Sequence, residues 1–144
     1  MPYTHALTVY DGTPEADDLL EMVCRIVRPH RAKLTILLVR LVPLTQPLPE
    51  YGAGEDAETD ALVARANKLA DRLRVKSAHA VRYARSLGSV VVAEARAHGV
   101  DLVALLAPDP DRLPTVEGLE PDTEIVLREA TCAVMLCRPG RRQR

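Results

Sequence analysis

Aromatic side chains are nearly missing from this sequence of 144 residues, which has four tyrosines, no phenylalanine and no tryptophan. The core is therefore expected to be aliphatic, and few rings are available to stack on a nucleic-acid base. An excess of one charge is missing as well, because 19 basic and 20 acidic side chains give a net charge of −1. Nucleic-acid binding relies on many unpaired Lys and Arg side chains, so the composition predicts no nucleic-acid partner.

Cysteine is also scarce, and the three present, Cys24, Cys132 and Cys137, are an odd number without C-x-x-C spacing. This pattern predicts neither a disulfide framework nor a thiol-based zinc site. The four histidines show no metal-binding spacing, so we expect no metal. No apolar run approaches the roughly 18 residues of a membrane span, and no secretory leader is recognisable. We expect a cytoplasmic protein without membrane insertion.

Short aliphatic segments alternate with segments of helical period along the whole chain. Strands are expected at 6–10, 34–42, 77–83, 101–107 and 133–137, and helices at 14–29, 56–74, 90–99 and 124–129. Such alternation predicts an α/β fold of three layers, an open parallel sheet with helices on both faces. The length suits one domain over residues 1–144, with a frayed basic tail at 138–144.

Local signals support two of the helix assignments. Thr13 is a suitable N-cap, Pro14 suits the first helical position, and acidic residues follow it. Residues 90–92 are three valines, which favour a strand, but the Ala, Glu and Arg residues after them favour a helix that Gly99 closes in a left-handed conformation.

Ligands of an open parallel sheet collect outside the carboxyl ends of its strands, here at residues 11–13, 42–54, 84–88 and 108–121. Neither G-x-G-x-x-G nor G-x-x-x-x-G-K-[ST] occurs in the sequence, which argues against a Rossmann cofactor and a P-loop nucleotide. No catalytic nucleophile has a recognisable context, and the acidic cluster of a response-regulator phosphoacceptor is reduced to Asp11. The residues themselves therefore do not indicate an enzyme.

Three segments resemble one family. Residues 9–15, VYDGTPE, resemble the V-D-G-S-x-E opening of universal stress proteins. Residues 95–105, ARAHGVDLVAL, are similar to that family's A-x-x-x-G-A-D-L-I-V-M, and residues 126–138, VLREATCAVMLCR, to its ending V-L-R-H-A-P-C-P-V-L-V-V-R. The resemblance covers essentially the whole chain, and it implies strand order 3-2-1-4-5 in an adenine nucleotide alpha hydrolase-like architecture.

ATP-binding members of that family share G-x2-G-x9-G-[ST] after the fourth strand. Aligned on the ending above, these positions hold Ala107, Pro110, Glu120 and Pro121, and all four depart from the pattern. Prolines without amide donors and several carboxylates in this stretch also disfavour a triphosphate. The resemblance therefore implies a non-catalytic stress-response or regulatory protein that does not bind ATP in the family's manner and needs no cofactor.

The alternative is an ATP- or AMP-binding protein, or a weak ATPase, that uses what is left of the family's pocket. Asp11 matches the acidic residue that approaches the nucleoside in binding members, and Val39 matches a position whose backbone meets adenine. Gly12, Thr13 and Ala107 complete the candidate nucleotide-binding residues, and Tyr10 and Tyr51 are the rings in range. Asp11 also suits a plain structural role, because Asp-Gly-Thr-Pro is a good turn and helix start.

The last strand is expected at the edge of the sheet, where exposed aliphatic strands tend to be paired or protected. Family members pair this strand antiparallel with a second copy, so the resemblance implies a homodimer buried around Val134 and Leu136. The predicted interface strand consists of Ala133, Val134, Met135, Leu136 and Cys137.

Overall fold

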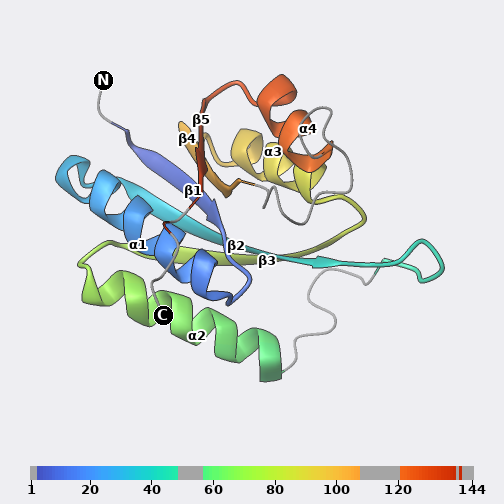
Figure 1. The fold of residues 1–144 in the computed structure, drawn as a ribbon, viewed down its shortest axis with the longest axis horizontal. Coiled ribbons are helices and arrows are strands. Elements are labelled where there is room, and N and C mark those ends of the chain that lie inside the picture. Colours follow the sequence, from blue (N-terminus) through green and yellow to red (C-terminus); the bar gives the residue numbers. More distant parts are fainter. Residues whose placement is uncertain (1–2, 49–56, 108–120, 139, 141–144) are drawn as a thin grey trace.

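The protein is described here by a computed structural model that covers residues 3–48, 57–107, 121–138 and 140. Five parallel strands form one sheet in the order β3-β2-β1-β4-β5, the order that the family resemblance implied (Figure 1). The elements in chain order are β1 (His5–Val9), α1 (Pro14–Val27), η1 (Arg28–His30), β2 (Lys33–Leu41), α2 (Ala57–Arg72), β3 (Ser77–Ala84), α3 (Leu87–Ala97), β4 (Leu102–Leu106), α4 (Pro121–Glu129) and β5 (Ala133–Cys137).

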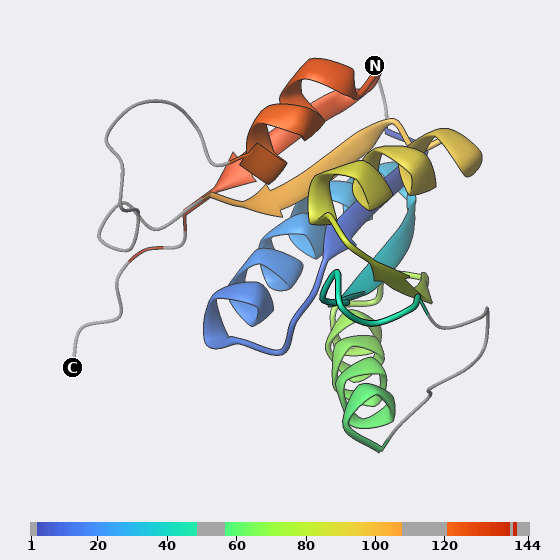
Figure 2. The same ribbon diagram turned by 90° about the vertical axis from the view of Figure 1, so that its right-hand side faces the viewer.

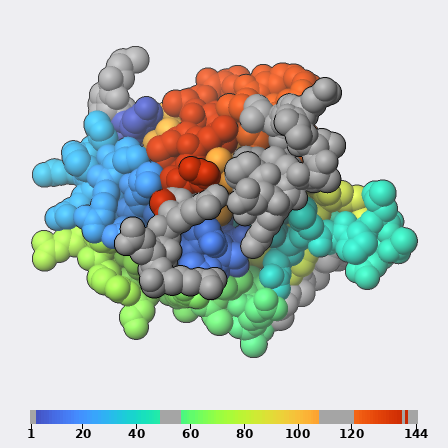
Figure 3. Space-filling view, viewed as in Figure 1, coloured from blue at the N-terminus to red at the C-terminus, as the bar shows by residue number. Residues whose placement is uncertain are grey.

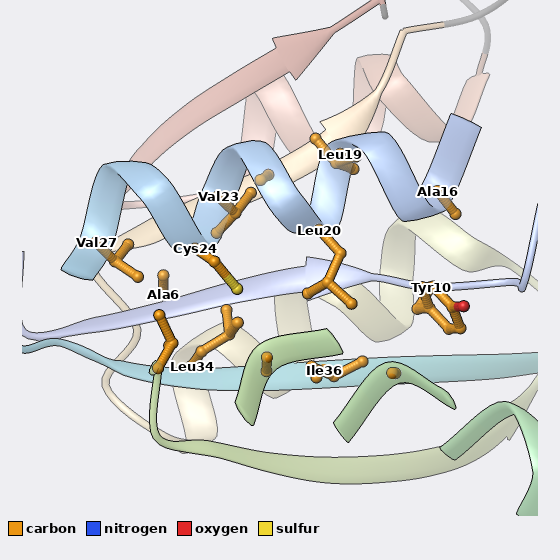
Figure 4. Packing of buried hydrophobic residues seen from close by; sticks show 14 of the residues in the cluster. Ala6, Tyr10, Ala16, Leu19, Leu20, Val23, Cys24, Val27, Leu34 and Ile36 are labelled. Atoms are coloured by element: carbon orange, nitrogen blue, oxygen red, sulfur yellow. The ribbon is translucent and has the colours of Figure 1, made fainter. Parts of the chain in front are cut away.

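Helices cover both faces of the sheet, α1 and α2 on one side and α3 and α4 on the other (Figures 1 and 2). Alternate side chains of each strand point to opposite faces, so the two faces carry separate aliphatic clusters. The cluster under α1 and α2 includes Leu20, Val23 and Ile36 (Figure 4). The cluster under α3 and α4 includes Leu37 and Val103. The aliphatic core and the three-layer α/β architecture predicted from the sequence are confirmed.

Helix α1 begins as its sequence predicted. The Thr13 hydroxyl accepts a hydrogen bond from the amide of Ala16 at 3.2 Å, and Pro14 occupies the first helical position. The predicted end near Pro29 was slightly late, because the α-helix stops at Val27 and tightens into the 3₁₀ helix η1. Arg31 then takes a left-handed conformation with φ of 54° and turns the chain into β2.

Helix α3 begins earlier than its residues alone indicated, at Leu87 and not at residue 90. Tertiary contact explains the difference, since the Asp122 carboxylate of α4 accepts hydrogen bonds from the Gly88 amide at 2.9 Å and the Ser86 hydroxyl at 3.3 Å. Gly99 closes the helix with φ of +62°, as predicted.

Several sequence predictions concern the periphery of the fold. Residues 42–48, after β2, project from the body of the molecule (Figure 3). The rest of the predicted loop to residue 54, the loop at 108–120 and most of the basic tail lie outside the described residues. Within the described ranges, no helix has the length and apolar character needed to span a bilayer. The three cysteines are free, with Cys24 and Cys137 buried.

Candidate functional site

The predicted site residues come together at one edge of the sheet. Strand order reverses between β1 and β4, which are neighbours although α1, β2, α2, β3 and α3 separate them in sequence. Asp11, Gly12 and Thr13 follow the carboxyl end of β1, and Ala107 follows that of β4. Val39 lies near the end of β2, two residues beyond Leu37, the last β2 partner of β1. This is the switch point at which open α/β sheets bind ligands.

Asp11 is engaged in the turn that starts α1. One carboxylate oxygen, Oδ1, accepts hydrogen bonds from the Thr13 amide at 3.0 Å and the Thr13 hydroxyl at 2.7 Å. Thr13 in turn caps the helix through Ala16, so the side chain of Asp11 orients the capping residue. Asp11 therefore has the structural role that its sequence context suggested, in the turn that starts α1. The side chain is also exposed, and its second oxygen accepts no hydrogen bond from the described residues.

Gly12 lies where the chain passes closest to α2. Its φ is +80°, and a Cβ atom there would overlap the side chain of Leu62. Its carbonyl oxygen accepts a long hydrogen bond of 3.4 Å from Arg65. Glycine suits both the left-handed backbone and the close approach, so the fold by itself accounts for Gly12.

A network around the buried Tyr10 side chain, beside this turn, was not predicted from the sequence. The Tyr10 hydroxyl donates a hydrogen bond of 2.6 Å to Oδ1 of Asp17, and Oδ2 of Asp17 forms an ion pair with Arg65 of α2. The network ties β1, α1 and α2 together. Burial, and then the hydrogen bond to Asp17, raise the pKa of Tyr10 well above its ordinary value. The seven-residue separation of Tyr10 and Asp17 in sequence is no known motif, so only the fold reveals the pair.

The position of Tyr10 corrects one expectation. Its ring is only 2% exposed and packs in the cluster under α1 and α2, next to Ala16 and Leu20 (Figure 4). Val39 lies on the opposite face, against the cluster under α3 and α4. Tyr10 is therefore not available to stack on an adenine held at Val39, and Tyr51, the other ring considered, lies outside the described residues.

The backbone of Val39 points toward the switch point. The Leu37 carbonyl accepts a hydrogen bond of 2.9 Å from the Tyr10 amide, so the main-chain groups of Leu37 face β1. Val39 lies two residues further along the strand and presents its amide and carbonyl in the same direction, beyond the last residue of β1. Its half-buried side chain packs against the cluster under α3 and α4, whereas its main-chain groups face the switch point.

Ala107 and the start of α4 offer little to a phosphate. The Ala107 amide donates to the Cys137 carbonyl at 2.7 Å and is used in holding β5. Helix α4 begins at Pro121, which has no amide hydrogen, and its first turn carries Asp122 and Glu124. An anion site at a helix N-terminus needs free amides and no competing carboxylate. Pro110 and Glu120, the other two positions of the glycine pattern, lie outside the described residues.

Basic side chains do occur near this edge, but protein groups already contact them. Arg40 pairs with Glu58 at 3.4 Å. Arg85 donates hydrogen bonds to the carbonyl oxygens of Pro43 at 2.5 Å and Gln46 at 2.7 Å, which holds the start of the projecting segment. Among the described residues, no group of three or more His, Cys, Asp or Glu side chains is arranged to hold a metal ion.

Comparison with known proteins places this geometry in context. A sequence model of the universal stress protein family matches residues 2–138. No curated protein sequence gave a significant match.

Solved structures share the fold at low identity. A universal stress protein crystallised with cAMP has a TM-score of 0.72 at 17% identity, with 96% of this chain and 98% of that chain covered. An Archaeoglobus fulgidus universal stress protein in complex with dAMP has a TM-score of 0.67 at 12% identity, covering 94% and 98%. A third, from Lactobacillus plantarum, has a TM-score of 0.61 at 21% identity, covering 96% and 99%.

Proposed function

The chain belongs to the universal stress protein family, and from that premise we propose that it is a non-catalytic stress-response or regulatory protein that does not bind ATP in the way the family's glycine loop implies. The start of α4 carries this proposal. Where a phosphate would need helix amides, the chain has Pro121, and the Asp122 carboxylate that follows is bonded to the start of α3. A triphosphate placed there would meet carboxylates and one amide donor fewer.

Isothermal titration calorimetry with ATP and Mg²⁺ tests the proposal. We expect no binding tighter than about 1 mM, which corresponds to about −4 kcal/mol. A dissociation constant in the low micromolar range would overturn it. Asp122→Asn serves as a probe of the cause, because it removes a charge at the α4 start and keeps an oxygen that can accept from Gly88. Recovery of measurable ATP affinity in this variant would identify charge as the barrier.

Binding of an adenine nucleotide with fewer phosphates is the alternative that specific observations favour. The Val39 backbone faces the switch point, and Asp11 keeps one oxygen outside its turn. Two structural neighbours were crystallised with cAMP and dAMP, which carry a single phosphate. If this alternative holds, AMP binds at least as tightly as ATP, because the added phosphates meet no favourable partner.

The variant Asp11→Asn separates the two roles of this residue. Asparagine keeps the oxygen that accepts from Thr13, so the turn and the α1 cap remain, while the negative charge is lost. Under the alternative, the AMP affinity falls by about tenfold, in keeping with the loss of one charge-assisted hydrogen bond, and thermal stability stays nearly unchanged. If neither the native protein nor the variant binds AMP, the alternative is wrong.

We also propose a homodimer through β5. Strand β5 is an edge of the sheet, and Val134, Met135 and Leu136 are only half-buried. Cys137 uses its carbonyl to hold β4, so by the two-residue period Val134 and Leu136 direct their amides to the open edge. Sedimentation equilibrium should give twice the chain mass of 15.8 kDa.

A backbone substitution tests the edge pairing. Val134→Pro removes an amide on the open side of β5 and should give the monomer mass, whereas Val134→Ala, which keeps that amide, should stay dimeric. Circular dichroism of both variants verifies that the fold is intact. A native protein that sediments as a monomer at micromolar concentration would contradict the dimer.

A further inference from the structure

A pocket of about 310 Å³ lies at the opposite end of the sheet from the switch point, where β1, β2 and β3 begin. Helix α3 packs mainly against α4 and contacts β2 and β3, but Ala78 near the start of β3 stays exposed. The small residues Thr35, Ser77, Ala78 and Ala80 also line the pocket. Six basic side chains and no acidic one line it, namely His5, Lys33, Lys76, His79, Arg82 and His98.

Two hydrogen bonds hold the His5 ring in the wall of this pocket. His5 places Nδ1 3.1 Å from the His98 carbonyl and Nε2 2.7 Å from the Thr35 hydroxyl. A carbonyl oxygen can only accept, so Nδ1 carries the hydrogen, and Nε2 accepts from Thr35 when the ring is neutral. A protonated ring would keep both contacts, with the Thr35 oxygen as acceptor. The pocket wall thus accommodates either charge state of His5.

A single carboxylate lies behind this wall, and it is already neutralised. Glu94 of α3 has a side chain only 9% exposed, and its Oε1 accepts a hydrogen bond from Nε of Arg82. Its Oε2 is buried, lies 3.2 Å from Nε2 of His98 and accepts no hydrogen bond within the described residues. Arg82 and Glu94 together carry no net charge, so the excess positive charge comes from the lysines, and from the histidines when they are protonated.

Lys33 and Lys76 are the free charges of the pocket. Both are exposed, and neither has an ion-pair partner in the part of the chain that the structure describes. Asp101 is a further acid near this end of the sheet, and its carboxylate oxygens accept hydrogen bonds from the Thr4 and His5 amides and the Thr4 hydroxyl. Asp101 is absent from the pocket lining and is occupied with the start of β1.

We propose that this pocket binds a small phosphate-type oxyanion, with Lys33 and Lys76 supplying charge and the His79 ring supplying a hydrogen bond, since both ring nitrogens of His5 are bonded within the wall. Basic side chains line the pocket from three strands and from the end of α3, so positive charge lies on several sides of a bound oxyanion. A planar carboxylate is best held by the fork of an arginine, and the arginine present, Arg82, is bonded to Glu94. The pocket is separate from the switch-point site, so it does not depend on the proposed function.

The four histidines and three lysines provide matched controls within the chain. His5, His79 and His98 line the pocket, whereas His30 lies at η1 with its ring against Tyr3. Titration of the full chain with inorganic phosphate at pH 6.5, followed by NMR of the histidine rings, should shift the three pocket signals and leave that of His30 unchanged. We expect a dissociation constant of about 1 mM or lower, and binding of malonate, a dicarboxylate, about fivefold weaker.

Substitution of the lysines tests their role. Lys33→Gln with Lys76→Gln should weaken phosphate binding by about tenfold, whereas Lys68→Gln on α2 should leave it unchanged. Equal shifts of all four histidine signals, no shift at 20 mM phosphate (about twentyfold above the expected dissociation constant), or unchanged affinity in the double variant would each overturn the proposal. Malonate binding as tight as phosphate would contradict the assigned ligand class.

Discussion

Charged residues are distributed differently at the two ends of the sheet although the chain is nearly neutral. Every helix runs back against its strands, so helix starts collect at the carboxyl end of the sheet and helix ends at the amino end. Acidic residues occupy the first turns of α1, α2 and α4, and basic residues occupy the last turns of all four α-helices. Helix dipoles favour this distribution in general. The ends differ more in how their charges are used.

At the carboxyl end, charged groups are bonded within the fold. Asp17 holds Tyr10 and Arg65, Asp122 holds the start of α3, and Arg85 holds backbone carbonyls. At the amino end, Lys33 and Lys76 have no ion-pair partner among the described residues. At the end where the family resemblance places a nucleotide, the charged side chains therefore bind other groups of the protein and stabilise the fold. The opposite end keeps cations available for a ligand.

The largest effect is expected where α3 meets α4 at the carboxyl end. In Gly88→Ala the new Cβ would lie 2.7 Å from the Asp122 carbonyl oxygen and 3.0 Å from Cβ of Ile125. The two helices must separate, and overpacking outweighs the better helix propensity of alanine, so we expect unfolding free energy about 2 kcal/mol lower in urea denaturation.

Gly99→Ala at the amino end is the control for that experiment. A Cβ at Gly99 meets no atom within 4 Å, and only its left-handed backbone is strained. We expect a loss of about 1 kcal/mol there. A Gly88→Ala protein that is as stable as the native chain would contradict the close packing of α3 on α4.

The next largest loss of stability is expected when the hydrogen bond between Tyr10 and Asp17 is removed. Tyr10→Phe removes the hydrogen bond to Asp17 and leaves a carboxylate with one partner fewer, so unfolding free energy should fall by about 1.5 kcal/mol at pH 7. Because the pKa of Tyr10 is raised in the folded state, its contribution is present below about pH 10 and is lost as pH rises further. The native chain should thus lose stability above pH 10 more steeply than Tyr10→Phe. Parallel curves would show that the bond is not formed.

A smaller effect on stability is expected for Asp101, an acidic residue that is bonded within the fold although it lies at the amino end of the sheet. Burial alone would raise the pKa of Asp101, but hydrogen bonds from Thr4 and His5 lower it below its ordinary value. The stability that Asp101 contributes is therefore present above about pH 4 and is lost as pH falls below it.

Asp101→Asn should lower unfolding free energy by about 1 kcal/mol at pH 7, with a smaller difference from the native chain at pH 3. Asp71→Asn, at an exposed site on α2, should change it by less than about 0.5 kcal/mol. Equal effects of the two substitutions would place Asp101 among the ordinary surface acids.

The fold was predictable from the sequence because local signals and global pattern agree. Alternating strand and helix periods, the Thr13 cap and the left-handed Gly99 all appear in the structure where they were expected. The start of α3 was not predictable, because three valines favour a strand and the contact that decides for a helix comes from Asp122, which lies 34 positions from Gly88.

The sites were less predictable than the fold. The topology predicted from the sequence placed Asp11, Val39 and Ala107 at one edge of the sheet. The burial of Tyr10 away from them could not be predicted. His5, His79 and His98 have no motif spacing, and they line one pocket only because β1, β3 and the end of α3 meet there. Residues that are distant in sequence and share no pattern become a site through packing alone.

The smallest expected effect is the sharpest test of the difference between the two ends. If Lys33 and Lys76 are free cations, Lys33→Gln with Lys76→Gln should change unfolding free energy at pH 7 by less than about 0.5 kcal/mol, as at other exposed positions. Removing like charges from a basic end should, if anything, raise stability slightly at low salt, and added salt should abolish the gain. Lys68→Gln provides the reference in the same urea denaturation series. A loss above about 1 kcal/mol in the double variant would mean that these lysines hold the fold together, as Asp17 and Asp122 do at the carboxyl end.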